Sequence, residues 1–461
     1  MITMNDYCRE KYGRKLYKLS LDGGFTCPNR DGTKGTGGCI FCSASGSGDF
    51  AESGNRIYEQ IENAKKRVDH KNKGGGYIAY FQSFTSTYAP VKRLEKTFAE
   101  AINHPDIDVL SVATRPDCLP DEVVALLGEL NKIKPVWVEL GLQSTKKESI
   151  AYMGRCYEND EYISAVKRLH GKGIYVITHI ILGLPDEDAD DMKNTLLFAL
   201  ENRTDGVKLQ LLHILRDSRL FSEYEKGNVK ALCKSGYLEI LMSLLPLIPD
   251  SVSVHRLTGD GNKNTLVAPL WSAHKKDVLN SVNRIVRLTE KHKGYVFRKI
   301  RKEEVPAMFS IILSRMKWMD EVGINQWNKT YYDEVYPLEY YEEHRKAGET
   351  FVLEQVSTGE IVAAAVLKGE DDRWEHIPSY KEKSAFYLHN FCSRTDKKGA
   401  GAVFLDFAEE YAKICEKDVF RLDSADDNFV LERYYSDRGY VPCGYCIDGL
   451  YKGILREKNI R

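Results

Sequence analysis

Three cysteines near the start of the chain, Cys27, Cys39 and Cys42, have the spacing of a metal site. Cys39 and Cys42 form a C-x-x-C pair, and a loop of eleven residues that contains four glycines separates them from Cys27. Thiolates with this spacing bind zinc or an iron–sulfur cluster. A structural zinc takes four ligands, and a cubane cluster takes one thiolate per iron. Three clustered thiolates therefore indicate one metal position that is left for an exogenous ligand.

In a cubane, the open iron can chelate the amino and carboxylate groups of S-adenosylmethionine (SAM). One-electron reduction of this cofactor yields a 5'-deoxyadenosyl radical. The glycines of the loop favour a cluster, because backbone that wraps a bulky inorganic group needs φ values that glycine adopts freely. The alternative is a zinc site whose fourth ligand is Cys8, Cys118 or a distant histidine.

The composition is that of a globular chain with several domains. Its 461 residues predict two or three domains, and it contains no run of eighteen apolar residues. Residues 1–14 lack the apolar core of a signal peptide, so we expect a cytoplasmic protein with no membrane partner. Eleven cysteines in that compartment favour reduced thiols and metal ligation over disulfides.

The charge argues against nucleic-acid binding by bulk electrostatics, because the formal net charge is −1. Two basic runs nevertheless exist, one from Arg9 to Lys18 and one from Lys65 to Lys73. Either run is able to touch phosphates. We interpret both as solvated faces, which is the commoner explanation for such runs.

The first 285 residues alternate short β-rich runs with longer helix-like stretches. This alternation is typical of a parallel sheet with right-handed crossovers. Six such units predict an α/β fold of the partial (β/α)6 barrel type. The expected strands are 17–21, 77–81, 109–113, 136–140, 175–181 and 207–212, and the expected helices are 54–68, 90–102, 121–130, 158–170 and 188–201.

Polar residues follow the predicted strands, where barrels carry their chemistry. Taken singly, Glu139 has the alternative role of a structural ion-pair partner, and His179 and His213 that of satisfied core histidines. Taken together, they form a ring at one end of the barrel, which favours a site. Further on, His255 and Arg256 precede a Gly-Asp-Gly turn at 259–261 and either orient an anionic substrate or brace the last strand.

The segment from Cys27 to Cys42 resembles the cluster loop of a radical SAM family of unassigned bacterial proteins. It reads Cys-Pro-Asn-Arg-Asp-Gly…Gly-Gly-Cys-x-Phe-Cys, and that family is itself similar to the radical domain of the catalytic Elongator subunit. The common superfamily motif has three residues between its first two cysteines, whereas this family shares the eleven found here. The resemblance implies a [4Fe-4S] cluster on Cys27, Cys39 and Cys42 with SAM on the open iron, and it leaves zinc as a minor alternative.

The resemblance extends to the SAM-binding residues. Gln82 and Ser83 stand where superfamily members bind the methionine amino group through backbone carbonyls. The fifth strand looks like the adenine strand, in which Ile181 packs on the purine and Gly183 makes room for it, although His179 stands where glycine is usual. The cofactor-binding residues expected in the barrel are Phe41, Gln82, Ser83, Glu139, Gln143, Ser144, Ile181, Gly183 and His213.

A second domain is expected after a polar stretch at 289–294. We predict a radical SAM domain over residues 1–288 and a mixed α/β domain over residues 295–461. In the latter, Gly399-Ala400-Gly401 precedes a central helix, and the element order resembles the GNAT acyltransferase fold. This implies acetyl-CoA binding by Gly399 and Gly401, because free N–H groups at a helix start hold the pyrophosphate. The expected strands are 295–300, 350–355, 361–367, 385–391, 419–423 and a final pair, and the expected helices are 305–319, 402–416 and 428–438.

Two features bear on the chemistry of this domain. The resemblance implies that Tyr435 or its neighbour Tyr434 protonates the departing thiolate. Asp396 stands where the usual pattern has arginine or glutamine, and it repels a pyrophosphate by about 1 kcal/mol or more. Lys397 and Lys398 are expected to compensate. Otherwise, the domain is a substrate-binding module that does not bind CoA.

The combined expectation is a radical SAM enzyme fused to a GNAT-like domain. The same two-domain order in the catalytic Elongator subunit makes tRNA, at a wobble uridine, the leading substrate. Flavodoxin or ferredoxin is the expected electron donor. The alternatives are an N-acetyltransferase of an amine with a structural cluster domain, and a non-catalytic protein that binds metal and a partner.

Overall fold

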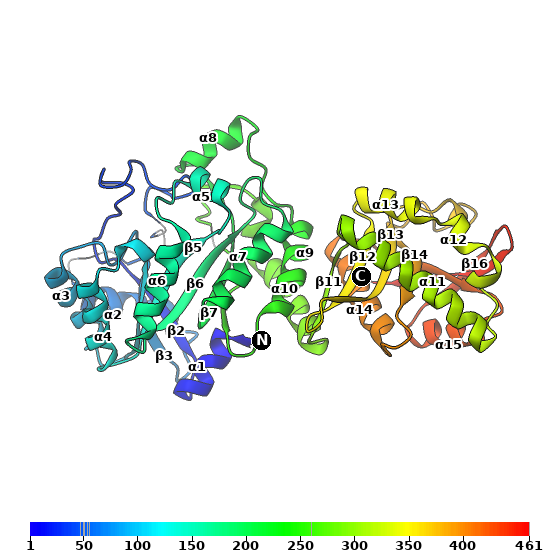
Figure 1. The fold of residues 1–461 in the computed structure, drawn as a ribbon. Helices are drawn as coiled ribbons and strands as arrows, with labels where there is room; N and C mark the ends of the chain where they lie inside the picture. The colour runs from blue at the N-terminus through cyan, green and yellow to red at the C-terminus, as the bar shows by residue number, and fades with distance from the viewer. Residues whose placement is uncertain (47, 49–50, 53, 55, 260, 461) are drawn as a thin grey trace. The chain divides into compact units, whose positions relative to one another are not determined.

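The computed structural model describes residues 1–46, 48, 51–52, 54, 56–259 and 261–460. It divides into two compact units, Met1–Tyr237 with Ile248–Leu279, and Leu238–Leu247 with Asn280–Arg461 (Figure 1). The predicted domain limits at residues 288 and 295 stay a prediction. The fold class is confirmed, because a curled parallel sheet precedes a separate mixed sheet.

The first unit contains a sheet with the order β1-β9-β7-β6-β5-β4-β3-β2, in which every neighbouring pair is parallel. All six predicted strands are present as β2 to β7, and two short strands extend the sheet at its far edge. A small antiparallel pair, β8 (Ile214–Leu215) and β10 (Leu266–Ala268), lies outside it. The bounds are β1 (Ile2–Thr3), β2 (Leu16–Leu21), β3 (Gly76–Phe81), β4 (Ile107–Thr114), β5 (Val136–Gln143), β6 (Tyr175–Leu182), β7 (Gly206–Leu211) and β9 (Ser253–Arg256).

Helices cover the outer face of this curled sheet, and their sequences show why (Figure 1). In α3 (Val91–Ile102), Leu94, Phe98, Ala101 and Ile102 form one buried apolar face. Because helices cover one face and packed side chains fill the other, strand β3 is buried along its whole length. The remaining helices are α1 (Met4–Tyr12), α2 (Ile57–Val68), α4 (Asp121–Asn131), α5 (Lys147–Met153), α6 (Asn159–His170), α7 (Ala189–Glu201), α8 (Arg219–Glu225), α9 (Lys234–Leu244) and α10 (Lys275–Lys291).

One predicted helix starts later than expected. The sequence pattern placed its start at Gly54, but α2 begins at Ile57 with Arg56 as its N-cap residue. Gly54 has no helical backbone, and Asn55 lies outside the described residues. The other predicted helices of this unit agree with the structure to within about a residue at each end.

Helix α1 closes the N-terminal end of the barrel. Its Cys8 is fully buried among Leu16, Val109 and Trp137, and Tyr7 packs against the indole of Trp137 with ring centroids 6.0 Å apart. This apolar layer seals one end of the barrel. The C-terminal ends of the strands, where the sequence predicts the site, remain the open end.

The second unit contains a seven-stranded sheet with the order β11-β12-β13-β14-β15-β17-β16. All of its pairs are antiparallel except β14 with β15. The sequence did not predict α12 (Tyr332–Val335) or α13 (Leu338–Lys346). The other elements are β11 (Tyr295–Lys299), α11 (Val305–Val322), β12 (Thr350–Gln355), β13 (Glu360–Lys368), β14 (Ala385–Ser393), α14 (Ala400–Ile414), β15 (Val419–Ala425), α15 (Phe429–Asp437), β16 (Val441–Asp448) and β17 (Tyr451–Asn459).

The parallel pair at the centre of this sheet separates along its length. Strand β14 pairs with β15 only from Ala385 to Leu388, and the rest of β14 stays with β13. Asn390, with φ of 52°, marks the point at which the strand is irregular. Separation of two central strands opens the sheet, and a large cavity lies there. The strand order of this sheet, the separation of β14 from β15 and the helices on both faces give the GNAT-like architecture expected from the sequence.

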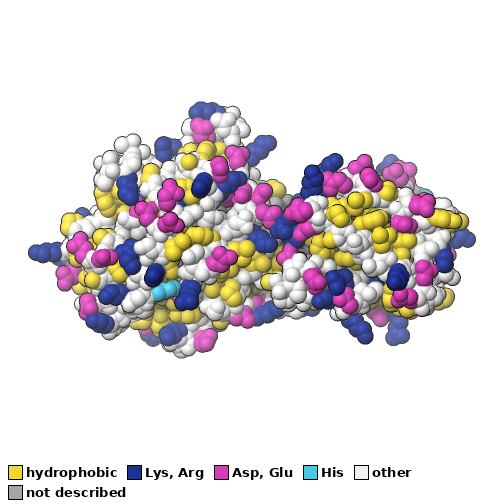
Figure 2. Space-filling model, in the orientation of Figure 1, with side chains coloured by type: hydrophobic (Ala, Val, Ile, Leu, Met, Phe, Trp, Pro, Cys, Tyr) yellow, Lys and Arg dark blue, Asp and Glu magenta, His cyan; other side chains and the backbone are white. Residues whose placement is uncertain are grey.

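No helix in the described part of the chain is both long and apolar enough to cross a membrane. On the face drawn in Figure 2, Lys and Arg side chains are interspersed with Asp and Glu. This agrees with the formal net charge of −1.

Candidate cluster and cofactor sites

The three motif cysteines converge on one cavity of the first unit. This cavity has a volume of about 150 Å³ and opens between the loop that follows β2 and the C-terminal halves of the barrel strands. Cys27, Cys39 and Cys42 all line it. Four of the other predicted cofactor residues also line it, namely Phe41, Gln82, Glu139 and Gln143.

Glycines and one asparagine set the path of the cysteine loop. Gly37 and Gly38 have φ values of 81° and 79°, and a Cβ atom on Gly38 would lie 2.9 Å from the Arg30 side chain. A larger residue would therefore strain this turn. Asn29 is 2% exposed, and its Nδ2 donates to the carbonyl of Gly154 at 2.7 Å and to Cys39 Sγ at 3.5 Å. The loop thus holds a hydrogen-bond donor against a sulfur that faces the cavity.

The donor set fits a cluster better than a single zinc ion. Burial, with Cys42 as the next contributor, raises the pKa of Cys39 to about 12. Such a thiol ionises only where a cation stabilises its thiolate. The three sulfur atoms do not all lie within 4.8 Å of one another. Thiolates on one tetrahedral zinc are only about 3.8 Å apart, because Zn–S bonds are about 2.3 Å long. Wider spacing suits thiolates that bind different irons.

The zinc ligands considered from the sequence do not complete a site. Cys8 is buried in the apolar layer at the opposite end of the barrel. Cys118 Sγ lies 3.8 Å from an oxygen of Asp117 and does not line the cavity. His179 lines the cavity, but its Nε2 lies 2.7 Å from Glu139.

Five predicted cofactor residues lie outside the lining of this cavity. Ser144 is fully buried and hydrogen-bonds Glu187, and His213 Nε2 lies 3.0 Å from Ser272 Oγ. Ile181 packs in an apolar cluster next to Met153. Their roles in cofactor binding stay predictions, as do those of Ser83, whose carbonyl accepts from Ser86, and Gly183, which has φ of 90°.

The sequence grouped Glu139 and His179 with His213 in one ring. The structure brings the first two together without His213 and extends them to a polar layer across the middle of the barrel. Its members come from seven adjacent strands, and five of them, Tyr80, Glu139, His179, Lys208 and Arg256, line the cavity. Barrel interiors are usually filled by branched apolar residues. The signal in the sequence was Lys208, a charged residue between Val207 and Leu209 in a predicted central strand. The layer consists of Lys18, Tyr80, Ser111, Glu139, His179, Lys208 and Arg256.

Glu139 is the centre of this layer and is fully buried. Lys18 Nζ donates to its Oε1 at 2.5 Å, and Ser111 Oγ donates to the same oxygen at 2.8 Å. Lys208 and His179 contact the other oxygen. Burial alone would raise the pKa of Glu139, but the two lysines outweigh it and hold that pKa well below its ordinary value. Burial, followed by Lys208, lowers the pKa of His179 to about 4, so His179 is neutral at pH 7 and donates its Nε2–H to the carboxylate.

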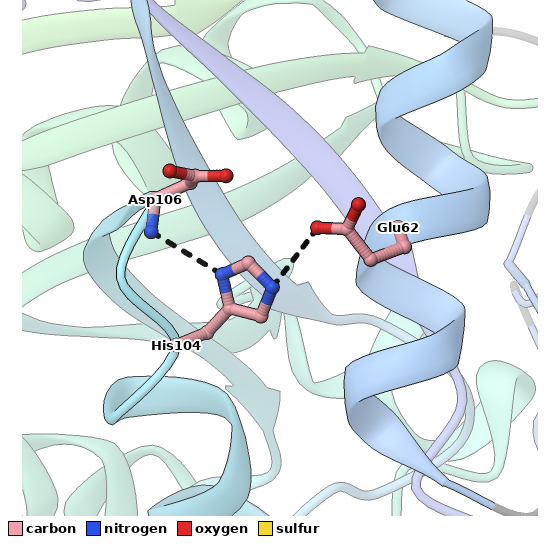
Figure 3. A group of neighbouring side chains, drawn as sticks. All are labelled: Glu62, His104 and Asp106. Atoms are coloured by element: carbon pink, nitrogen blue, oxygen red, sulfur yellow. Dashed lines mark hydrogen bonds and ion pairs between the residues drawn. The ribbon is translucent and has the colours of Figure 1, made fainter.

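A second group of potential metal ligands is an ion-pair network. Glu62 on α2 and His104 and Asp106 after α3 place their ligand atoms within 4.8 Å of one another (Figure 3). His104 Nε2 lies 3.1 Å from Glu62, and its Nδ1 accepts from the backbone N–H of Asp106 at 3.2 Å. Lys65 donates to both carboxylates. The ammonium group already supplies the cation that these acids need.

The cavity of the second unit has a volume of about 1210 Å³. It lies where β14 and β15 separate, and Gly401, Tyr434 and Tyr435 line it. Gly399 is the N-cap of α14 with φ of 86°, so the first N–H groups of that helix begin directly after a left-handed residue. Tyr435 is 6% exposed, and burial raises its pKa, so its hydroxyl carries a proton at neutral pH.

The structure gives Asp396 a partner. Arg394 donates to both of its carboxylate oxygens at 2.9 Å. This bidentate pair offsets the negative charge expected to oppose a pyrophosphate. Arg394 also lies 3.3 Å from Glu360, and Lys397 lies 3.6 Å from the same residue.

Comparison with known proteins identifies the first unit. Residues 30–199 match the model of the Radical SAM superfamily, and residues 204–287 match that of the Radical_SAM C-terminal domain. The protein YtqA of Bacillus subtilis is 42% identical over 304 residues, which cover 65% of this chain and 94% of YtqA. This chain is a member of the radical SAM superfamily.

Other proteins are similar to this chain at lower identity. The tRNA uridine(34) acetyltransferase of Methanocaldococcus jannaschii is 26% identical over 199 residues, covering 42% of this chain and 35% of that protein. A solved structure of the archaeal Elp3 of Methanocaldococcus infernus covers 95% of this chain and 98% of its own, with 14% identity and a TM-score of 0.43.

Proposed function

We propose that this chain is a radical SAM enzyme whose [4Fe-4S] cluster is bound by Cys27, Cys39 and Cys42. The observation that carries this proposal is that the three motif cysteines line the same cavity as the polar C-terminal ends of the barrel strands. The match to the superfamily models supports it. We further propose that the protein works in the cytoplasm, whose reducing conditions keep such thiols reduced.

The cofactors supply the radical, and the residues of the chain position it. When bound and reduced by a low-potential donor such as flavodoxin or ferredoxin, the cluster supplies the electron that cleaves SAM to methionine and a 5'-deoxyadenosyl radical. This chemistry would abstract a hydrogen atom from the substrate. Gln82 and Gln143, which line the cavity at the ends of β3 and β5, would hydrogen-bond SAM. The apolar side chain of Phe41 covers the cavity beside the cysteines and keeps water from it.

We propose tRNA as the substrate, with modification of a wobble uridine side chain. The support is the name of a relative, the tRNA uridine(34) acetyltransferase, which is similar over 42% of this chain. Mass spectrometry of tRNA nucleosides from cells with and without the gene tests this step. A nucleoside that disappears with the gene is expected. Identical nucleoside profiles would contradict a role on tRNA.

We also propose that the second unit binds acetyl-CoA at the start of α14, with Tyr435 or Tyr434 as the acid that protonates the thiolate. Backbone N–H groups and the positive end of the helix dipole favour phosphate there. The cavity at the separated strands has room for the rest of the cofactor.

Replacement of Gly401 by aspartate is expected to weaken acetyl-CoA binding by at least about 100-fold. A Cβ atom on Gly401 would lie 3.3 Å from the ring of Phe391, and a carboxylate at the helix start repels the pyrophosphate. Calorimetric titration of the full-length protein measures the loss. Gly369→Asp is the matched control, because a Cβ atom there meets nothing within 4 Å. Absence of binding to the wild type would end the acyl-CoA part of the proposal.

A further inference from the structure

The floor of the barrel cavity has more basic groups than acidic ones. Lys18, Lys208 and Arg256 belong to the polar layer, and Glu139 is the one carboxylate that faces them among the described residues. The side chain of Lys208 is only 4% exposed and that of Lys18 16% exposed. Cations removed from water in this way need acceptors, because burial disfavours their charged forms.

The single carboxylate is already fully used. Each of its oxygens has two partners, Lys18 and Ser111 on one, and Lys208 and His179 on the other. Glu139 therefore has no oxygen left to accept a hydrogen bond from Arg256. Burial lowers the pKa of Lys208, Glu139 opposes this, and Lys18 and Arg256 lower it further, so an anion bound beside Lys208 would favour its charged ammonium form. The layer is consequently short of negative charge.

Arg256 is the half-buried cation of this layer. It is the register partner of Lys208 on the neighbouring strand, so two like charges stand side by side at the cavity wall. The side chain of Arg256 has no hydrogen bond or ion pair with any described residue. The other arginines of the lining each have protein acceptors: Arg30 donates to carbonyls of Ser43 and Ala44, Arg115 to Asp117, and Arg155 to carbonyls of Leu142, Ser144 and Tyr157.

We propose that Arg256 and Lys208 bind an anionic group, a carboxylate or a phosphate, of the substrate of the barrel. This inference rests on the proposed function, since it places the substrate in the cavity that the three cysteines line. A guanidinium group binds such anions in bidentate geometry, and an ammonium group adds a third donor. The cavity of about 150 Å³ admits a small charged group, which holds the neighbouring part of the substrate near the cysteine end.

Thermal unfolding of the full-length protein in two anions tests the proposal. Inorganic phosphate and acetate are each compared with chloride at matched ionic strength. We expect at least one of them to raise the unfolding temperature of the first unit saturably. Protection by phosphate alone assigns a phosphorylated substrate, and protection by acetate alone assigns a carboxylate. A wild-type protein that neither anion protects would overturn the proposal.

Arg256→Gln is expected to lower the affinity of the protein for the protecting anion at least tenfold. Arg256→Lys, which keeps the charge, should lower that affinity by less. Arg9→Gln is the matched control, because Arg9 lies on the outer surface with its side chain 64% exposed. In chloride, Arg256→Gln is expected to unfold at the same or a higher temperature than the wild type, because it removes a cation that has a like-charged neighbour. Equal anion affinity in wild type and Arg256→Gln would refute the assignment.

Two further measurements distinguish the anion site from the cofactor site, and the failure of this proposal from the failure of the proposed function. Saturating SAM is expected to leave the anion affinity of the wild type unchanged, whereas competition would show that Arg256 serves the cofactor and would overturn the proposal. Anion binding is measured without reductant. Failure of SAM cleavage with an intact anion site would therefore count against the proposed function, and loss of the anion site with active cleavage would count against this inference.

Discussion

Replacement of Cys27, Cys39 or Cys42 by alanine is expected to remove most of the iron that the anaerobically reconstituted protein binds. The wild type should carry roughly four irons and four sulfides per chain, because three thiolates hold a cubane with one open iron. Each substitution removes one of three sulfur ligands that converge on the same small cavity. Iron and sulfide analysis, with the visible absorption of the cluster, measures the loss.

Cys443→Ala is the control for these variants. Cys443 lies on β16 of the second unit, is a free thiol and does not line the cavity. The Cys443→Ala protein should keep the full iron content. Stoichiometric zinc with no iron in the anaerobically purified wild type would contradict the cluster assignment. Full iron retention in the three cysteine variants would also contradict it.

Glu139→Gln is expected to destabilise the first unit by roughly 3–5 kcal/mol, because it leaves two buried lysines without their carboxylate. The side chain is 0% exposed and has four hydrogen-bonding partners, so the amide cannot reproduce the network. For a unit of this size, the unfolding temperature should fall by roughly 6–20 °C. Scanning calorimetry of the full-length, cluster-free protein measures the shift.

Glu129→Gln is the matched control, because its side chain is 70% exposed and pairs only with the equally exposed Lys132. The loss in Glu139→Gln should also depend on pH. Glu139 raises the pKa of Lys208 against the effect of burial, so its removal lowers that pKa further. The folded variant then excludes the proton of Lys208 over a wider pH range than the wild type, and the loss of stability should shrink as the pH rises toward the ordinary pKa of lysine. A Glu139→Gln protein as stable as the control at pH 7 would show that the layer does not bear on stability.

The sequence predicted the strands of the first unit well, because strands depend on local pattern. Apolar runs separated by amphipathic helices identified β2 to β7. The spacing of Cys27, Cys39 and Cys42 selected three thiols that the structure brings to one cavity, and their role as cluster ligands stays a prediction. Strand β9, only four residues long, gave too short a pattern to recognise. Helices α12 and α13 were missed because their tyrosine-rich sequences lack a clear apolar face; Tyr341 is the fully buried residue of α13.

Depth within the barrel was harder to predict than position along the chain. Lys18 was interpreted with Arg9 as part of a solvated face, yet its side chain is 16% exposed against 64% for Arg9. Charge alone does not reveal that a lysine points inward, because its buried partner, Glu139, lies more than a hundred residues away. Ile181 packs in an apolar cluster with Met153, which lines the cavity, whereas Ile181 does not.

Reductive cleavage of SAM by the full-length, reconstituted protein tests the central claim most directly. With a strong one-electron reductant and no added substrate, the wild type is expected to form 5'-deoxyadenosine and methionine in equal amounts, each cleavage consuming one electron and the 5'-deoxyadenosyl radical taking its hydrogen from solvent components or protein. The Cys39→Ala protein should form neither above background, and Cys443→Ala should match the wild type. A reduced, SAM-bound cluster that yields no 5'-deoxyadenosine would contradict the account.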